Sequence, residues 1–368
     1  MLINTAAWLT ATQAPLQVKA APYTQPRDSE IVVKNHAVAI NPIDWLLQVI
    51  GYFIFPWIKP PFVLGSDLAG EVVEVGKGVT RFQVGDRVLA HAVGSDKKRN
   101  RSAEGAFQTY TVVLAHMAAP IPSTMPYENA AVLPLGLSTA ACGLFQKDHL
   151  ALQYPSLASK PTGKTLLVWG GSTSVGSNAI QLAVAAGYEV ITTASPRNFD
   201  YVKNLGASQV FDYNSKTAVK DIIKAFQGKT LAGALAIGKG SAEACVDIVQ
   251  ACSGSKFVSM ASVSVSLEDY PRRSQLPLLI FKLVLSNVSL QAKCRIRNIR
   301  TKFLNGSTLM DNEVSKVIYE DFLPHALAEG RYAAAPEPCV VGTGLDSMQA
   351  GLDVQRKGVS AKKVVVSL

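Results

Sequence analysis

Strand-like and helix-like segments alternate along residues 163–262, and this alternation constrains the fold more than any other feature of the chain. Apolar runs such as TLLVW at 165–169 and YEVITTA at 188–194 are separated by helical stretches such as SNAIQLAVAAG at 177–187. Short strands that alternate with helices of this length form βαβ units, in which a parallel sheet has helices on both faces. The pattern predicts an α/β fold for this part of the chain.

The first 130 residues have a different pattern, in which strand-like runs follow one another without long helical stretches. The segments IVVKNHAVAI at 31–40, EVVEVG at 71–76 and DRVLAHAV at 86–93 alternate or are bounded by Gly and Asp, which is typical of strands. Residues 346–368 read as a helix followed by a strand. Because 368 residues exceed one ordinary core, we expect a β-rich domain and an α/β domain.

The charge distribution does not favour nucleic-acid binding. The chain has 36 Lys and Arg residues against 27 Asp and Glu residues, a net charge of +9. The basic residues do not gather with aromatic residues on one element, so we expect no nucleic-acid partner. We interpret the runs KKRNR at 97–101 and RIRNIR at 295–300 as solvated loops, since charged side chains are mostly exposed.

Two further features bear on location and metal binding. No apolar run is long enough to span a bilayer, and no basic residue precedes Lys19, so we expect a cytoplasmic protein with no membrane association. The five cysteines are scattered, without a CxxC pair or a Cys/His pair at ligand spacing. They are interpreted as reduced thiols, and no metal site is expected.

A glycine-rich turn, GGSTSVG, follows the strand-like run at 165–169 and precedes a helical stretch. This is the context that a dinucleotide site requires, because the turn must bring backbone N–H groups close to a pyrophosphate. The predicted pyrophosphate turn consists of Gly170, Gly171, Ser172, Thr173, Ser174, Val175 and Gly176. An ordinary strand-to-helix turn is the alternative. The residues that follow the next strand help to decide between the two.

The second strand-like run ends in Ser195, Pro196, Arg197 and Asn198, without an acidic residue. Domains that bind NAD usually have Asp or Glu at this place, where it bonds to the ribose hydroxyls. A hydroxyl and a guanidinium instead suit a 2′-phosphate, and Tyr213 after the third strand could reach the same group. The sequence therefore favours NADP(H). The alternative for Arg197 is a surface arginine at the start of a helix.

Together with these two turns, further short motifs are spread along nearly the whole chain. They are NPIDW (41–45), VLGSDLAGEVVEVG (63–76), VGDRV (84–88), GAFQTYTVV (105–113), PLGLSTA (134–140), GGSTSVG (170–176), SPRNFD (195–200), LGASQVFDY (205–213) and GLDVQRKGVSAKKVVV (351–366). In this order they resemble the medium-chain dehydrogenases/reductases. The GGST and SPRNFD motifs are similar to those of the fungal trans-acting enoyl reductases and their quinone-reductase-like relatives.

The resemblance implies two domains. Residues 1–140 and 301–368 would form a GroES-like β-rich catalytic domain, and residues 141–300 an inserted Rossmann domain that binds NADP. The implied nicotinamide contacts are Ile43, Asp44, Trp45 and Leu46, the implied substrate segment is Leu135, Gly136, Leu137, Ser138, Thr139 and Ala140, and Gly344 and Leu345 would make a return contact to the cofactor.

The chain departs from the resemblance in two ways. Zinc enzymes of this superfamily carry Cys and His ligands where this chain has NPID and Gly65-Ser66-Asp67, so no metal ligand is expected there, and His91 alone makes no site. Leu46 stands where polyketide enoyl reductases often have a lysine, which removes a cation beside the cofactor and substrate.

Zinc independence bears on the reaction. Without a Lewis acid nothing lowers the pKa of an alcohol, whereas reduction of an activated C=C bond needs a hydride and a hydrogen-bond donor for the enolate. Ser138 and Thr139 are the candidate donors. We expect an NADPH-dependent reductase of enoyl thioesters or α,β-unsaturated carbonyl compounds in secondary metabolism. Its substrate would be a small molecule or a carrier-bound acyl group, with a polyketide synthase as a partner and a monomer or homodimer as the assembly.

Two alternatives remain at this point. An NADPH quinone oxidoreductase would use the same cofactor with a flat aromatic acceptor. A nucleotide-binding partner protein without catalysis would bind NADPH and reduce nothing.

Overall fold

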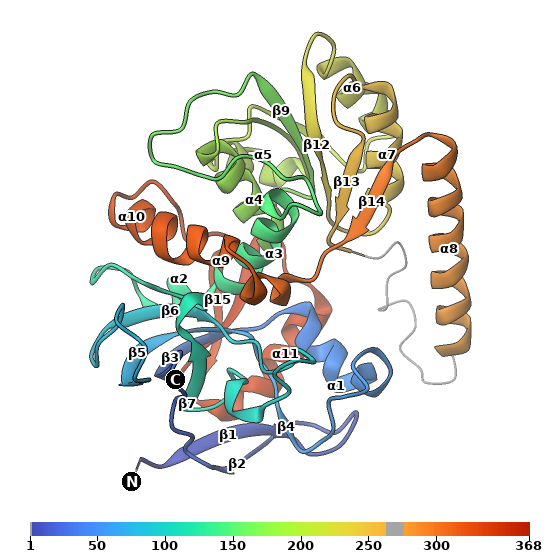
Figure 1. Cartoon of the computed structure of the whole chain (residues 1–368). Coiled ribbons are helices and arrows are strands. Elements are labelled where there is room, and N and C mark those ends of the chain that lie inside the picture. The colour runs from blue at the N-terminus through green and yellow to red at the C-terminus, as the bar shows by residue number, and fades with distance from the viewer. Residues whose placement is uncertain (1, 263–275) are drawn as a thin grey trace. The chain divides into compact units, whose positions relative to one another are not determined.

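The computed structural model describes residues 2–262 and 276–368 (Figure 1). The chain divides into two compact units. The first unit comprises the residues up to Ser138 together with Leu309–Leu368, and the second unit comprises Thr139–Thr308. The domain boundaries expected from the sequence, after residues 140 and 300, stay predictions.

Strand β3 (Glu30–Ala39) is the centre of the sheet in the first unit. One of its edges pairs with β5, and the other pairs with β7 over Glu30–Lys34 and with β16 over Ala37–Ala39. The described strands follow the order β15-β16-β3-β5-β6-β8, with β7 on β3, and β15 and β16 are the parallel pair. Their bounds are β5 (Asp67–Val75), β6 (Arg87–His91), β7 (Tyr110–Leu114), β8 (Ala118–Pro120), β15 (Glu337–Thr343) and β16 (Lys362–Ser367).

A smaller sheet and several helices complete the first unit. The smaller sheet has the order β2-β1-β4, with β1 (Asn4–Leu9), β2 (Gln17–Ala21) and β4 (Phe62–Val63). The helices are α1 (Pro42–Ile54), η1 (Ser102–Glu104), η2 (Ala115–Met117), α2 (Tyr127–Ala131), α9 (Val314–Lys316), the π-helix η7 (Val317–Phe322), α10 (Leu323–Ala328), η8 (Leu345–Ser347) and α11 (Met348–Lys357). Two further elements, α3 (Pro134–Phe145) and η6 (Gly306–Asp311), cross the division between the units.

The second unit contains a parallel sheet with the strand order β11-β10-β9-β12-β13-β14 (Figure 1). Two strand series run outward from β9 in opposite directions, which is the strand order of a doubly wound dinucleotide-binding sheet. The strands are β9 (Lys164–Trp169), β10 (Glu189–Ala194), β11 (Gln209–Asp212), β12 (Thr230–Ala236), β13 (Phe257–Met260) and β14 (Arg300–Phe303). The helices are α4 (Ser174–Ala185), η3 (Pro196–Asn198), α5 (Phe199–Asn204), α6 (Ala218–Ala225), α7 (Ser241–Ala251) and α8 (Leu276–Ile296).

The core of the second unit explains why these segments form a sheet covered by helices. Leu167, Ile191 and Val258 come from three different strands and are fully buried with Val246 and Val249 of α7. Strands buried in this way read as continuous apolar runs in the sequence. The predicted α/β fold with a β-rich GroES-like part and a Rossmann-like part is confirmed.

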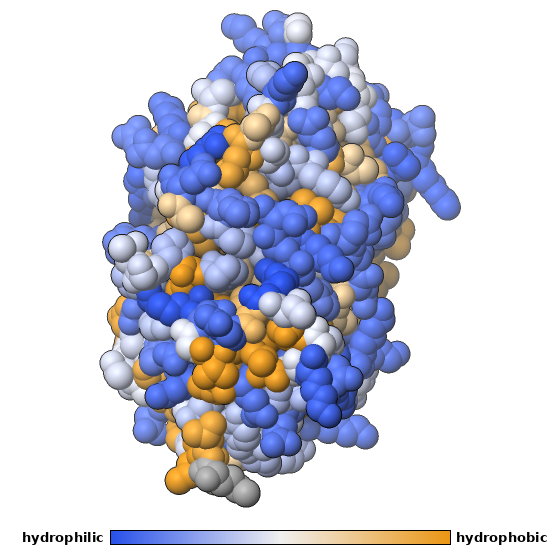
Figure 2. Space-filling model, turned by 60° about the vertical axis from the view of Figure 1, so that its left-hand side comes forward, coloured by the Kyte–Doolittle hydropathy of each residue, from blue (hydrophilic) through white to orange (hydrophobic). Residues whose placement is uncertain are grey.

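Hydrophilic residues cover most of the face in Figure 2, and the apolar residues between them form small groups. Such groups are normal on a globular protein. No described helix is both long enough and apolar enough to cross a bilayer.

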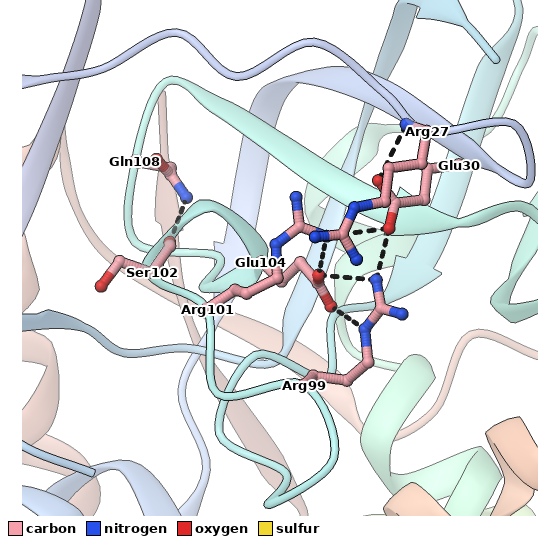
Figure 3. Close-up of polar contacts among 7 residues, drawn as sticks. All are labelled: Arg27, Glu30, Arg99, Arg101, Ser102, Glu104 and Gln108. Carbon is pink, nitrogen blue, oxygen red and sulfur yellow. Dashed lines mark hydrogen bonds and ion pairs between the residues drawn. The ribbon is translucent and has the colours of Figure 1, made fainter.

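The run KKRNR is not the solvated loop that its composition predicts. Arg99 and Arg101 both form ion pairs with Glu30 and Glu104 (Figure 3). Both carboxylates are 1% exposed and the two arginines are 17% and 20% exposed. The interpretation was wrong for these two residues because Glu30 lies on β3, about 70 positions earlier, and local sequence does not reveal such a partner. The ionic cluster of these four residues fastens residues 94–105 to the sheet.

Candidate functional site

The glycine turn of the second unit lies between β9 and α4, where the sequence predicts it. Gly170 has a left-handed φ of 89°, and its N–H donates to Thr193 Oγ1 at 3.0 Å. The N–H of Gly171 donates to the Thr193 carbonyl at 2.9 Å, so both glycines are bonded to the end of β10. A Cβ on Gly171 would lie 2.3 Å from Thr192 Oγ1. The close approach of the turn to the neighbouring strand therefore requires glycine.

Thr173 is the N-cap of α4, and its hydroxyl forms both of its hydrogen bonds within the turn. The hydroxyl accepts the Gly176 N–H at 3.0 Å and donates to the Gly170 carbonyl at 2.8 Å. A Cβ on Gly176 would lie 2.2 Å from the Gly170 carbonyl oxygen, so helix and turn meet at a point where a side chain does not fit. Because the Thr173 hydroxyl hydrogen serves the turn, Ser172 and Ser174 are the hydroxyls left for a ligand.

Three backbone donors at the start of α4 have no hydrogen-bond partner in the described part of the chain. They are the N–H groups of Ser172, Ser174 and Val175, all on half-buried residues. Unpaired N–H groups at the first turn of a helix attract anions, and the helix dipole adds to this attraction. The glycines leave the turn free of side chains, and these three donors line it. Such an arrangement fits a pyrophosphate.

The second predicted part of the cofactor site follows β10. Parallel pairing aligns Ala194 of β10 with Asp212 of β11, so Ser195 and Tyr213 leave the same edge of the sheet on neighbouring strands. Arg197 is exposed in η3, and within the described residues it has no ion pair. Tyr213 is 47% exposed. Asn198 is buried and donates its amide to Ser195 Oγ at 3.2 Å, which fixes the turn that presents Arg197.

In the first unit, the NPIDW motif forms the start of α1. Asn41 is the N-cap, and Asp44 Oδ2 accepts the Asn41 N–H at 2.7 Å in a capping box. Asp44 and Trp45 are buried, whereas Ile43 and Leu46 are half-buried. Burial, helped by the nearby Asp67 charge, raises the pKa of this carboxyl to about 7, although the Asn41 N–H acts to lower it. The aspartate of the motif thus has a capping role.

Asp67 connects three separate segments of the first unit. Its Oδ2 lies 2.9 Å from Lys363 Nζ of β16 and accepts the Asn41 amide at 2.9 Å. Its Oδ1 accepts the Leu135 N–H, at the start of α3, at 2.6 Å. The Lys363 ammonium also donates to Asn41 Oδ1. Asp67 is fully buried and Lys363 is 4% exposed. Sequence reasoning did not identify Asn41 or Lys363, because a lysine in an apolar strand gives no local sign of its partner.

A second buried chain of hydrogen bonds holds Ser138. Its hydroxyl lies 2.9 Å from His91 Nδ1 and 2.7 Å from the Tyr319 hydroxyl, which donates to the Pro134 carbonyl at 3.1 Å. All contacts are satisfied when His91 donates to Ser138 and Ser138 donates to Tyr319. Burial, which outweighs the nearby Asp67 charge, lowers the pKa of His91 to about 4, so the imidazole is neutral at pH 7. Tyr319 was not identified from the sequence.

The remaining predicted residues differ in exposure. In α3, Leu135 and Thr139 are half-buried, whereas Gly136, Leu137, Ser138 and Ala140 are buried. Gly344 has a left-handed φ of 79° and donates its N–H to the Ser367 carbonyl at 2.8 Å, and Leu345 begins η8 as a half-buried residue.

The residues at the place of the superfamily's zinc ligands do not fit a zinc ion. Asp67 is bonded to an ammonium, an amide and a backbone N–H, and its neighbour Ser66 is a buried hydroxyl. A cation therefore already faces the Asp67 carboxylate, and Asp44, the other carboxylate there, caps α1. In the described ranges, no group of three or more His, Cys, Asp or Glu side chains is arranged to hold a metal.

The chain is similar to known proteins along most of its length. Residues 27–123 match the alcohol dehydrogenase GroES-like domain, and residues 174–266 match the family described as zinc-binding dehydrogenase. The chain is 56% identical to Dehydrogenase pigH of Monascus ruber, over 100% of both chains. It is 39% identical to Trans-enoyl reductase himH of Aspergillus japonicus, over 100% of this chain and 98% of that protein.

Solved structures agree on the fold. The CurK enoyl reductase matches with a TM-score of 0.74 at 19% identity, over 99% of each chain. A quinone oxidoreductase from Coxiella burnetii matches with a TM-score of 0.69 at 20% identity, also over 99% of each chain. The chain therefore belongs to the medium-chain dehydrogenases/reductases, a family of oxidoreductases, with relatives among fungal dehydrogenases and trans-enoyl reductases of secondary metabolism.

Proposed function

We propose that this oxidoreductase uses NADPH to reduce the activated C=C bond of an enoyl thioester or another α,β-unsaturated carbonyl compound, without zinc. One observation carries the cofactor assignment. The acid-free turn that presents Arg197 leaves the same sheet edge as Tyr213, beside the glycine turn, in which the N–H groups of Ser172, Ser174 and Val175 have no partner among the described residues. The reaction class is supported by the relatives named trans-enoyl reductase.

The proposed cofactor contacts divide into two groups. The N–H groups of Ser172, Ser174 and Val175 would hold the pyrophosphate, since anions are favoured at a helix N-terminus. Arg197, Ser195 and Tyr213 would hold the 2′-phosphate, where a guanidinium is well suited to phosphate oxygens. An acidic side chain at the end of β10 would repel this phosphate, and Ala194 and Ser195 stand there instead.

The bound cofactor supplies a hydride to the β-carbon of the substrate. The chain must then stabilise the negative charge that develops on the carbonyl oxygen, which requires a hydrogen-bond donor. Thr139 suits this role better than Ser138. It is half-buried and makes no hydrogen bond through its hydroxyl within the described residues, whereas the Ser138 hydroxyl already serves Tyr319. Water can supply the final proton.

The proposed substrate is a small-molecule or carrier-bound acyl group, and a polyketide synthase is the proposed partner. The relatives named trans-enoyl reductase, at 31–39% identity, support an unsaturated acyl substrate. The polyketide synthase is proposed from the resemblance of the GGST and SPRNFD motifs to those of the fungal trans-acting enoyl reductases.

The test is an assay of NADPH oxidation by the purified protein with crotonyl thioesters, simple enones and quinones. We expect turnover with the thioesters and enones, a preference for NADPH over NADH, and no loss of activity after treatment with a metal chelator. Turnover with quinones alone would replace the proposed reaction by quinone reduction. Tight NADPH binding with no turnover on any acceptor would indicate a non-catalytic binding protein.

A further inference from the structure

The buried Asp67 carboxylate holds together the two segments on which the proposed reaction depends. Through Oδ2 it accepts the amide of Asn41, the N-cap of the helix that carries residues 43–46. Through Oδ1 it accepts the N–H of Leu135, the first turn of the helix that carries Thr139. One carboxylate therefore sets the spacing between the start of α1 and the start of α3.

Net stability does not account for a charged pair at this place. Lys363 and Asp67 are 4% and 0% exposed, so both charges have lost nearly all their water. Replacing such a pair by apolar residues of similar volume is often neutral or stabilising, because the desolvation cost disappears. Apolar residues would, however, accept no hydrogen bond from Asn41 or Leu135. The geometry of the hydrogen bonds is the property that the pair supplies.

We propose that Asp67 is a positioning residue for the reduction, and that Lys363 holds its carboxylate in the orientation that joins Asn41 to Leu135. The proposal rests on the proposed function. It acts through α1 and α3, and it assigns Asp67 no contact with substrate or cofactor.

Two double variants separate positioning from stability. Asp67→Leu with Lys363→Met removes both charges and both hydrogen bonds. Asp67→Asn with Lys363→Met also removes both charges, but its amide oxygen can accept the Leu135 N–H and its amide nitrogen can donate to a reoriented Asn41. Both variants remove the two opposite charges together, and Asp44 keeps its hydrogen bond from the Asn41 N–H, so both are expected to fold. Thermal unfolding checks this before any kinetic comparison.

The kinetic readout is kcat/KM for the unsaturated thioester, together with the primary deuterium isotope effect on kcat with labelled NADPH. The leucine variant should lose roughly 10- to 100-fold in kcat/KM, because small misplacements of reacting groups have effects of this size. Its isotope effect should rise as hydride transfer becomes slower. The asparagine variant should stay close to the wild-type protein. Equal kcat/KM values and isotope effects for the two folded variants would overturn the proposal.

A binding readout needs no turnover and separates this proposal from the proposed function. The Kd for NADPH and for 2′-phospho-ADP-ribose, which lacks nicotinamide, are measured for both variants. The leucine variant should raise the Kd for NADPH by roughly 2- to 10-fold relative to the Kd for the fragment. A loss of this size corresponds to one contact of hydrogen-bond strength between the displaced α1 and the nicotinamide part of the cofactor. Equal Kd ratios in both variants would contradict the positioning role even if the wild-type protein reduced no acceptor.

Glu104→Gln is the matched control, because it breaks another buried ion pair of the same unit in the ionic cluster of Figure 3. It should lower the unfolding temperature and leave kcat/KM per folded molecule and the Kd ratio unchanged. A fall in kcat/KM equal to that of the leucine variant would mean that any weakened ion pair has this effect, and would overturn the specific role of Asp67.

Discussion

Ala194 at the end of β10 is paired with Asp212 at the end of β11, and the residues that follow them, Ser195 and Tyr213, leave the sheet side by side. β10 also pairs with β9, whose last residue precedes the glycine turn. The register of three neighbouring strands therefore gathers at one sheet edge the residues that the sequence indicates for a phosphorylated dinucleotide.

Arg197→Ala should weaken NADPH binding much more than NADH binding. A hydrogen bond to a charged group is worth about 1.5–3 kcal/mol, which corresponds to a rise in Kd of about 10- to 150-fold for NADPH. Fluorescence titration with both cofactors measures the effect. Lys203→Ala removes another exposed cation of the second unit and should change both Kd values little. A similar loss for NADH and NADPH would count against the 2′-phosphate assignment.

Gly176→Ala should destabilise the protein and weaken the binding of both NADPH and NADH. The new Cβ would lie 2.2 Å from the Gly170 carbonyl oxygen, so the helix must shift away from the turn. Overpacking of this kind costs about 1–3 kcal/mol. Urea unfolding and cofactor titration measure the two effects.

Gly51→Ala in α1 provides the comparison for Gly176→Ala, because its Cβ would meet Leu47 at an ordinary 3.5 Å. Gly51 follows a kink at Ile50, where the helix is interrupted, so no gain in helix propensity is counted and the free energy of unfolding should stay close to that of the wild-type protein. An unaltered stability in Gly176→Ala would show that the turn and helix can separate without cost.

His91 should make the stability depend on pH between 6.5 and about 4. Its pKa is lowered from 6.5 to about 4, chiefly by burial, with Asp67 acting to raise it and Lys363 to lower it. Within this range the unfolded chain binds a proton that the folded chain does not, so stability falls as the pH falls. The slope from one such group approaches about 1.4 kcal/mol per pH unit.

The variant His91→Asn isolates this contribution, because its amide can still donate to Ser138 and does not titrate. Urea unfolding at several pH values should give a shallower fall in stability for the variant than for the wild-type protein. Identical slopes would show that the pKa of His91 is the same in the folded and the unfolded chain, and would contradict the lowered pKa.

Glu30→Gln should lower the free energy of unfolding at neutral pH by about 3 kcal/mol, because it leaves two arginines with an incomplete set of partners. Burial acts to raise the pKa of Glu30, but the Arg27 N–H and the Arg99 and Arg101 charges outweigh it, so the pKa lies below 4.5. The stabilisation is therefore present above pH 4.5 and is lost as the pH falls through the lower pKa of the folded state. The difference in the free energy of unfolding between wild type and variant should therefore become smaller as the pH falls below 4.5, which urea unfolding at several pH values measures. A constant difference down to the lowest pH would contradict the ion pairs.

The sequence predicts those parts of the fold and site that depend on neighbouring residues. The strand, glycine turn and helix at 164–185 are local, and so is the absence of an acid after β10. It does not predict contacts that the folded chain makes between distant positions. Lys363 looks like a solvent-facing residue at the start of KKVVVS until Asp67 is found 2.9 Å away, and the partners of Ser138 come from Tyr319 and His91. A buried polar residue is recognised by its partner, which the sequence does not reveal.

The position of β16 has a consequence for how the chain is made. This strand lies between β15 and β3, and it supplies Lys363, yet it follows the whole second unit in the sequence. During synthesis the second unit is complete while β3 still lacks β16, so the edge of β3 over Ala37–Ala39 stays open until β16 has left the ribosome. The contacts of Asp67 that join α1 to α3 are thus fastened last, by a residue translated almost 300 positions after the carboxylate that it holds.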